Sequence, residues 1–210
     1  MTARRRILIH QIKEWGEILV GFETRNRYEL KDEQGRLIGY AAEEGGGFGR
    51  VIGRQLLGSG RKATIHVLNE TGKEVARGEK PFTWFFHRID VFEGERKLGA
   101  IRRRFTMLRR RFTVETADGR ELFEIDSPVL QFWTFHVLFR GREVGVIKKQ
   151  WSGLLKEWFT DADVFGLEYE DLPELNAVRP LLVFATLLVD LVCFENNQGR
   201  GGLFLPVGGE

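Results

Sequence analysis

The chain has 210 residues, of which 42% are hydrophobic and 12% aromatic, and its formal net charge at pH 7 is +2. That much apolar sequence can bury one substantial core, and the near-neutral balance excludes a globally cationic binder. The single cysteine, Cys193, excludes an internal disulfide and a thiolate zinc site, so a reducing compartment fits best. Serine, cysteine and acidic residues form no recognisable nucleophile motif, and we expect no enzyme.

The first predicted element is a helical segment over residues 7–19. Its apolar side chains fall at helical spacing: Leu8, Ile12, Trp15 and Leu19. The arginines before it give the chain a start like that of a signal peptide, but polar residues interrupt the apolar region too early. We therefore expect no export signal and a cytoplasmic location.

Most of the remaining chain alternates apolar and polar residues, with polar turns between the runs. Each of these turns contains a glycine, at Gly35, Gly72, Gly94, Gly119 and Gly141. Glycine accepts the positive φ that tight hairpins need, so the pattern predicts five successive hairpins. A series of antiparallel strands leaves exposed edges unless the sheet closes, and we expect a closed antiparallel β-barrel. The run Gly-Gly-Gly-Phe-Gly-Arg at 45–50 is interpreted as a flexible loop rather than a phosphate cradle.

Residues 101–112 read Ile-Arg-Arg-Arg-Phe-Thr-Met-Leu-Arg-Arg-Arg-Phe and predict a strand, a short turn and a second strand. Alternation places Arg102 and Arg104 on one face and Arg103 on the other, and the second strand repeats the split. Six arginines converge near this turn: Arg102, Arg103, Arg104, Arg109, Arg110 and Arg111. They are candidates for contact with an anionic lipid surface, and the alternative is a solvated set of charges paired with acids.

The nearby run Pro-Phe-Thr-Trp-Phe-Phe-His at 81–87 offers a second candidate lipid contact. Trp84 and Phe85 in this run are of the types that favour the boundary between water and hydrocarbon. Aromatic side chains also dominate protein cores, so burial in a strand is the competing interpretation.

Residues 180–194, Pro-Leu-Leu-Val-Phe-Ala-Thr-Leu-Leu-Val-Asp-Leu-Val-Cys-Phe, are apolar on every side. A helix over this run is about 21 Å long, against roughly 30 Å of bilayer hydrocarbon. Asp190 adds a penalty of roughly 2.5–3.5 kcal/mol near a bilayer centre. We therefore favour a helix inside the barrel, within residues 173–195, over a membrane segment, and Pro180 lies either in its first turn or at a kink.

Several segments together resemble the phospholipid scramblase family, from about residue 7 to residue 196. The most specific are Gly-Phe-Glu-Thr-Arg-Asn-Arg-Tyr at 21–28 and Phe-Thr-Asp-Ala-Asp-Val-Phe-Gly at 159–166. The resemblance implies a tubby-like fold, a twelve-stranded antiparallel barrel around a hydrophobic C-terminal helix. It also implies calcium-stimulated movement of phospholipids between leaflets.

The resemblance places a calcium segment at Asp161, with Asp163, Phe165 and Asp171 as further candidate ligands. Asp171 stands one place before the position where the family has an acid, and Phe165 offers only its backbone carbonyl. The following Val-Phe-Gly-Leu-Glu-Tyr alternates as a strand, so we favour an acidic turn that enters a strand, with weak calcium binding at most.

From these observations we expect one barrel domain over residues 1–198 and a flexible glycine-rich tail over 199–210. The predicted function is scramblase-like: binding of anionic phospholipids at the inner face of the membrane, with transbilayer movement that calcium stimulates. The alternative is a peripheral reader of phosphoinositides or other anionic lipids that does not scramble. Nucleic-acid binding through the same arginines ranks last.

Overall fold

A computed structural model describes residues 3–12, 24–44, 61–84, 86–128, 130–131, 133–149 and 164–194. The strands that these residues form are β1 (Arg4–Gln11), β2 (Thr24–Lys31), β3 (Leu37–Glu44), β4 (Ala63–Leu68), β5 (Glu74–Lys80), β6 (Arg88–Glu93), β7 (Arg96–Arg104), β8 (Arg109–Thr116), β9 (Glu121–Pro128), β10 (Thr134–Phe139), β11 (Arg142–Lys149) and β12 (Val164–Glu170).

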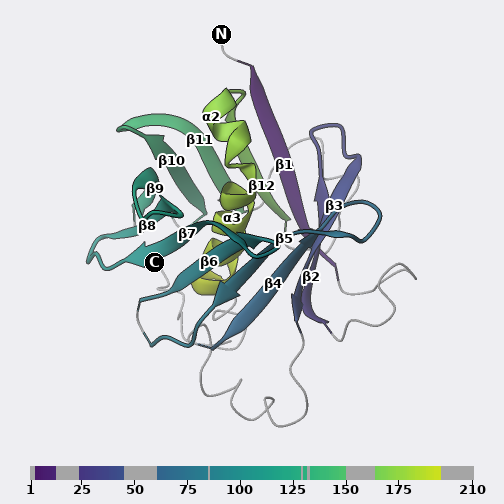
Figure 1. The fold of residues 1–210 in the computed structure, drawn as a ribbon. Coiled ribbons are helices and arrows are strands. Elements are labelled where there is room, and N and C mark those ends of the chain that lie inside the picture. The colour runs from purple at the N-terminus through teal and green to yellow at the C-terminus, as the bar shows by residue number, and fades with distance from the viewer. Residues whose placement is uncertain are drawn as a thin grey trace, which may run out of the picture.

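The twelve strands close into one barrel in which each strand pairs with its neighbours in the chain. The barrel is sealed where β1 pairs antiparallel with β12 on one side and with β2 on the other. Figure 1 shows β1 standing between β12 and β2. The predicted fold class, a closed antiparallel barrel of twelve strands, is confirmed.

All five predicted glycine turns are present at one end of the barrel. Their glycines have φ between 56° and 86°, values at which a side chain is strained. Just after each turn the register shifts by one residue on the second strand. The residue left over is apolar in every case: Ile38, Val75, Leu98, Leu122 and Val144. Such bulges increase the local twist, which helps a sheet to close.

The predicted helix over residues 7–19 is wrong where the structure describes it. Residues 4–11 form β1, and the amide of Ile12 still donates to the carbonyl of Arg27 at 2.9 Å. Ile7 and Ile9 point into the core from one face of the strand. Pairing with β12 and β2 outweighs the helical spacing, because β1 completes the barrel. Residues 13–19 lie outside the described part of the chain.

Two helices take the place of the single predicted helix over 173–195: α2 (Pro173–Ala177) and α3 (Arg179–Cys193). The break at Val178 has a local cause, because Pro180 lies in the first turn of α3 and has no amide to continue the ladder from α2. Figure 1 shows α3 running down the middle of the barrel.

Helix α3 fills the barrel. Every residue from 181 to 192 is buried, and the helix packs against β6, β7, β8 and β12. The polar side chains on it are accommodated: Asp190 accepts a hydrogen bond of 2.8 Å from the hydroxyl of Tyr28, and Thr186 donates to the carbonyl of Leu182 at 3.0 Å. In the described part of the chain, no helix has the length and apolarity that a membrane crossing requires.

Candidate functional site

The two ends of the barrel differ. The tight hairpins gather at one end, and the connections that follow β5, β7 and β9 lie at the other. We use the name loop rim for the described residues of three neighbouring connections at this second end. They are residues 81–84, 86–87, 105–108, 130–131 and 133.

Exposed apolar side chains concentrate on the loop rim. Among the described residues, nine large hydrophobic side chains are exposed, and eight of these belong to the loop rim: Phe82, Trp84, Phe86, Phe105, Met107, Leu108, Leu130 and Trp133. Exposure reaches 87% for Met107 and 88% for Leu130. The ninth, Val75, lies at the hairpin end. A concentration of this kind marks a surface that meets a partner or a membrane.

Four of the six candidate arginines lie on the outer wall beside the loop rim and meet carboxylates. Arg102 and Arg104 reach Glu115 at 2.8 and 3.2 Å. The other two pair on the next strand, Arg109 with Asp126 and Arg111 with Glu124 at 3.1 Å. The predicted split of Arg102 and Arg104 from Arg103 agrees with the strand register, since Arg103 pairs with the buried Phe112.

The inner side of the same end is cationic. By strand alternation, Lys80, Arg103, Arg110 and Lys149 follow inward-facing core residues. Arg103, Arg110 and Lys149 lie near the C-terminal end of α3, which has no basic residue in its own last turn. A helix C-terminus carries partial negative charge, so these strands supply the cations that the helix lacks. The Lys149 ammonium also lies 4.7 Å from the ring centroid of Phe194.

Burial and the positive charges at this end of the barrel act on the pKa values of two nearby groups, Cys193 and His87. Burial raises the pKa of the Cys193 thiol to about 11, against the smaller opposing effect of the Arg103 and Arg110 charges. His87 is 3% exposed, and burial lowers its pKa to about 4, helped by the charges of Lys80 and Arg103. At neutral pH both groups are therefore uncharged.

We expect the Cys193 thiol to be inert in the folded protein. A pKa of about 11 instead of 9.0 leaves about 100-fold less thiolate at pH 8, and the thiolate is the reactive form. Alkylation followed by mass spectrometry is therefore expected to be at least about 100-fold slower in buffer than in denaturant. Equal rates in the two solvents would contradict the burial of this helix end.

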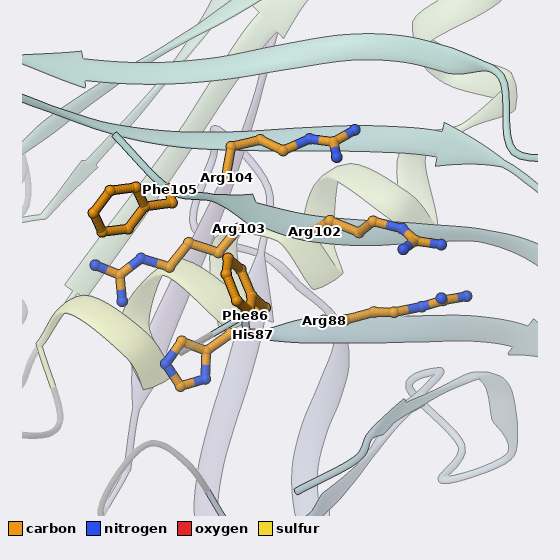
Figure 2. Close-up of a pocket in the computed structure, with 7 residues that line it drawn as sticks. All are labelled: Phe86, His87, Arg88, Arg102, Arg103, Arg104 and Phe105. Carbon is orange, nitrogen blue, oxygen red and sulfur yellow. The ribbon is translucent and has the colours of Figure 1, made fainter. Parts of the chain in front are cut away.

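The arginines and aromatic residues enclose a cavity of about 270 Å³ at the loop rim. Its lining comes from residues before and within β6 and from the end of β7: Phe86, His87, Arg88, Arg102, Arg103, Arg104 and Phe105. In Figure 2 Arg103 extends to the side of the cavity where Phe105 and His87 lie, whereas Arg88, Arg102 and Arg104 extend the other way. The loop rim thus combines exposed apolar side chains, paired outer arginines and a cationic inner face.

The candidate calcium residues are only partly described. Asp161 and Asp163 lie outside the described residues, as does Phe85 of the aromatic candidates. Phe165 is 1% exposed at the start of β12, and its ring packs 5.5 Å from that of Phe194. Asp171 follows the other end of β12, about 20 Å away for a strand of this length.

Asp171 is already engaged at that far end. Its carboxylate accepts hydrogen bonds of 2.7 Å from Arg5 and from Asn176, which hold its pKa below the usual range. The strand predicted over residues 164–169 is present as β12, and it keeps Phe165 and Asp171 apart, so these two do not share one calcium site. Within the described ranges, no group of three or more histidine, cysteine, aspartate or glutamate side chains could hold a metal ion.

The sequence interpretation missed much of the loop rim. It chose Trp84 but not Phe105, Met107 or Leu108, although these three separate the two arginine triplets. It also did not single out His87, which is buried. Counting back two residues from the inward-facing Ile89 indicates an inward direction for His87.

The fold and the loop rim together define a class: a barrel filled by its own C-terminal helix, with an amphipathic surface at one end. Comparison with known sequences gives the family. The profile of the Scramblase family matches residues 1–196, and the chain belongs to this family.

Among the curated relatives, phospholipid scramblase 2 of Bos taurus is 29% identical over 215 residues, which cover 95% of this chain and 72% of the bovine protein. Phospholipid scramblase 1 of Rattus norvegicus is 28% identical over 222 residues, and the match covers 97% of this chain but 65% of the rat protein. Among solved structures, a protein from Arabidopsis thaliana matches with a TM-score of 0.47 and 13% identity, over 89% of this chain and 93% of that one.

Proposed function

We propose that the protein binds anionic phospholipid membranes through the loop rim and promotes transbilayer movement of their lipids. The observation that carries the proposal is the position of eight exposed apolar side chains beside six arginines at one end of the barrel. The Scramblase family profile and relatives named phospholipid scramblase support the same function. In this proposal the membrane is approached from its cytoplasmic side, which fits the lone cysteine.

Two forces act on this surface. Apolar tips such as Phe105, Met107 and Leu108 gain free energy when they leave water, up to about 1.5–3 kcal/mol for a fully buried large side chain. Basic side chains near an anionic surface gain about 1 kcal/mol each. Four of the six arginines of β7 and β8 pair with three carboxylates, Glu115, Glu124 and Asp126, so the six positive charges outnumber the acids and the patch keeps a net positive charge. Reversible attachment is the expected result.

Lipid movement is assigned to the contact between the loop rim and the bilayer. A polar head group needs a polar path across roughly 30 Å of hydrocarbon. The interior of the barrel offers little room for such a path, because α3 fills it with buried apolar side chains. Insertion of the apolar tips is expected instead to disturb lipid packing next to the rim.

In this proposal calcium contributes little to membrane binding. Phe165 and Asp171 stand at opposite ends of β12, and Asp171 already pairs with Arg5. Flotation with vesicles of anionic lipid is therefore expected to change little between added calcium and added chelator. A liposome assay that follows the exchange of labelled lipid between leaflets, with and without calcium, tests the transport step separately.

The test of docking replaces the three apolar tips between the arginine triplets. The variant Phe105→Ser/Met107→Ser/Leu108→Ser removes three side chains that are 80–87% exposed. We expect its affinity for vesicles with anionic lipid to fall at least about tenfold, because apolar burial at the interface is lost. Folding should be unaffected, since exposed side chains contribute little to stability.

Val75→Ser is the matched control, because Val75 is exposed and apolar but lies at the hairpin end. It should bind vesicles as the unchanged protein does. Equal binding of the triple variant and the unchanged protein would contradict docking through the loop rim. Vesicle binding that DNA displaces and that depends on the arginines alone would favour the nucleic-acid alternative.

A further inference from the structure

The cavity at the loop rim contains a guanidinium that no carboxylate of the described residues neutralises. Of its four arginines, Arg88 pairs with Asp90 at 2.5 Å, and Arg102 and Arg104 pair with Glu115. Arg103 forms no ion pair and no side-chain hydrogen bond with any described residue. Its backbone is fixed, because its amide donates to the carbonyl of His87 at 2.8 Å.

The direction of Arg103 differs from that of its neighbours. Figure 2 shows it among Phe105, Phe86 and His87, while the three paired arginines extend away toward the outer wall. An unneutralised guanidinium beside a buried histidine, in a cavity of about 270 Å³, is arranged to receive an anion. The planar guanidinium fork matches the oxygens of a phosphate group.

His87 provides a second polar group on the same wall. It is buried, and its Nδ1 lies 3.4 Å from the hydroxyl of Thr83. The charges that face it come from Lys80 at the end of β5 and Arg103 near the end of β7. A phosphate dianion beside Arg103 offsets this positive potential, so its arrival favours the protonated imidazole, which donates from both ring nitrogens.

We propose that the cavity binds the phosphate group of a phosphomonoester head group of a membrane lipid, held by Arg103 and His87. The lipid source follows from the position of the cavity, since the rings of Phe86 and Phe105 at its edge are 66% and 80% exposed on the loop rim. When the rim meets a bilayer, these rings lie at the depth of the glycerol and upper acyl chains, and the cavity lies among head groups. The inference deepens the proposed function and rests on it.

The test uses glycerol 3-phosphate as a soluble probe and reads the His87 imidazole by NMR. The chain has four histidines, which makes the imidazole signals assignable. We expect a saturable shift at His87, and a pKa of His87 that rises from about 4 when the probe is bound. Glycerophosphocholine, whose diester phosphate carries one negative charge that the choline balances, should bind more weakly, because a monoester carries more negative charge.

Arg103→Gln is expected to lower the affinity for the probe by roughly 10- to 100-fold, because hydrogen bonds to a charged group are lost. Arg103→Lys should restore part of the affinity, because the charge stays but the fork is lost. Arg120→Gln is the matched control, since it removes the same charge at the hairpin end, where Arg120 pairs with Asp118 outside the lining of the cavity, and it should leave the probe's affinity unchanged. A dispersed NMR spectrum shows that each variant is folded.

The outcomes separate this inference from the docking proposal. Vesicles that contain phosphatidic acid should bind the unchanged protein more tightly than vesicles with an equal charge of diester lipid, and Arg103→Gln should abolish the difference. Vesicle binding without a saturable shift at His87 would overturn the phosphate site and leave docking intact. A shift at His87 without vesicle binding would refute docking and show a site for free phosphate. An equal loss in Arg103→Gln and Arg120→Gln would show general charge attraction and overturn the site.

Discussion

Replacing Phe184 by alanine is expected to lower the free energy of unfolding by about 3–5 kcal/mol, the usual cost of removing a fully buried aromatic side chain. Phe184 is 0% exposed in the middle of α3. Its ring occupies a space that β5 leaves open at Gly78, where an added Cβ would lie 2.5 Å from Cε1 of Phe184. Urea denaturation followed by tryptophan fluorescence measures the loss, and Leu130→Ala, on the exposed rim, should cost less than about 0.5 kcal/mol.

Gly78→Ala tests the same contact from the barrel side. The new methyl group overlaps Phe184 and Ile89, so a cost of about 1–3 kcal/mol is expected from overpacking. The double variant Gly78→Ala/Phe184→Ala should be more stable than the sum of the two losses indicates, by about 0.5–3 kcal/mol, since the methyl group then enters vacated space. Strictly additive losses would show that Phe184 does not depend on the gap at Gly78.

Sequence patterns correctly predicted the features of this fold that depend on a few neighbouring residues, such as the turns and the buried helix. Each turn glycine was expected from the need for positive φ, and all five have it. The helix inside the barrel was expected from a run that is apolar on every side and too short for a bilayer, and residues 181–192 of α3 are buried. Pro180 was expected in a first turn or at a kink, and it lies in the first turn of α3, just after the break that separates α2 from α3.

Pairing between strands, some of them far apart in the chain, determined the features that the sequence patterns did not predict. Residues 7–11 have helical spacing, yet they close the barrel through β12, which lies more than 150 residues later in the chain. Alternation separated Arg103 from Arg102 and Arg104, but the register of β7 against β8 determines that Glu115 lies beside the latter two. The cavity at Arg103 therefore follows from the register between strands and not from any motif.

Acid is expected to destabilise the fold through His87. In the unfolded chain a histidine takes up a proton near pH 6.5, whereas burial delays protonation of His87 in the folded protein until about pH 4. The unfolded state therefore binds more protons between these values, and the free energy of unfolding falls as the pH is lowered from about 6.5 to 4. The full shift corresponds to about 3 kcal/mol, and screening by water at the barrel mouth reduces the expected loss to about 2 kcal/mol.

His87→Gln should remove this part of the acid sensitivity, as measured by urea denaturation at a series of pH values. His10, whose pKa burial also lowers, contributes a loss of the same sign that remains in the variant. The carboxylates of Asp90 and Glu168, whose pKa is lowered, add a separate loss as the pH falls below about 4. His136→Gln is the control, because this side chain lies on the outer side of β10 beside Glu143, and its pH profile should keep the steep segment. Identical profiles for His87→Gln and the unchanged protein would show that His87 takes up its proton at the same pH in the folded and the unfolded chain, and would contradict the lowered pKa of the buried imidazole.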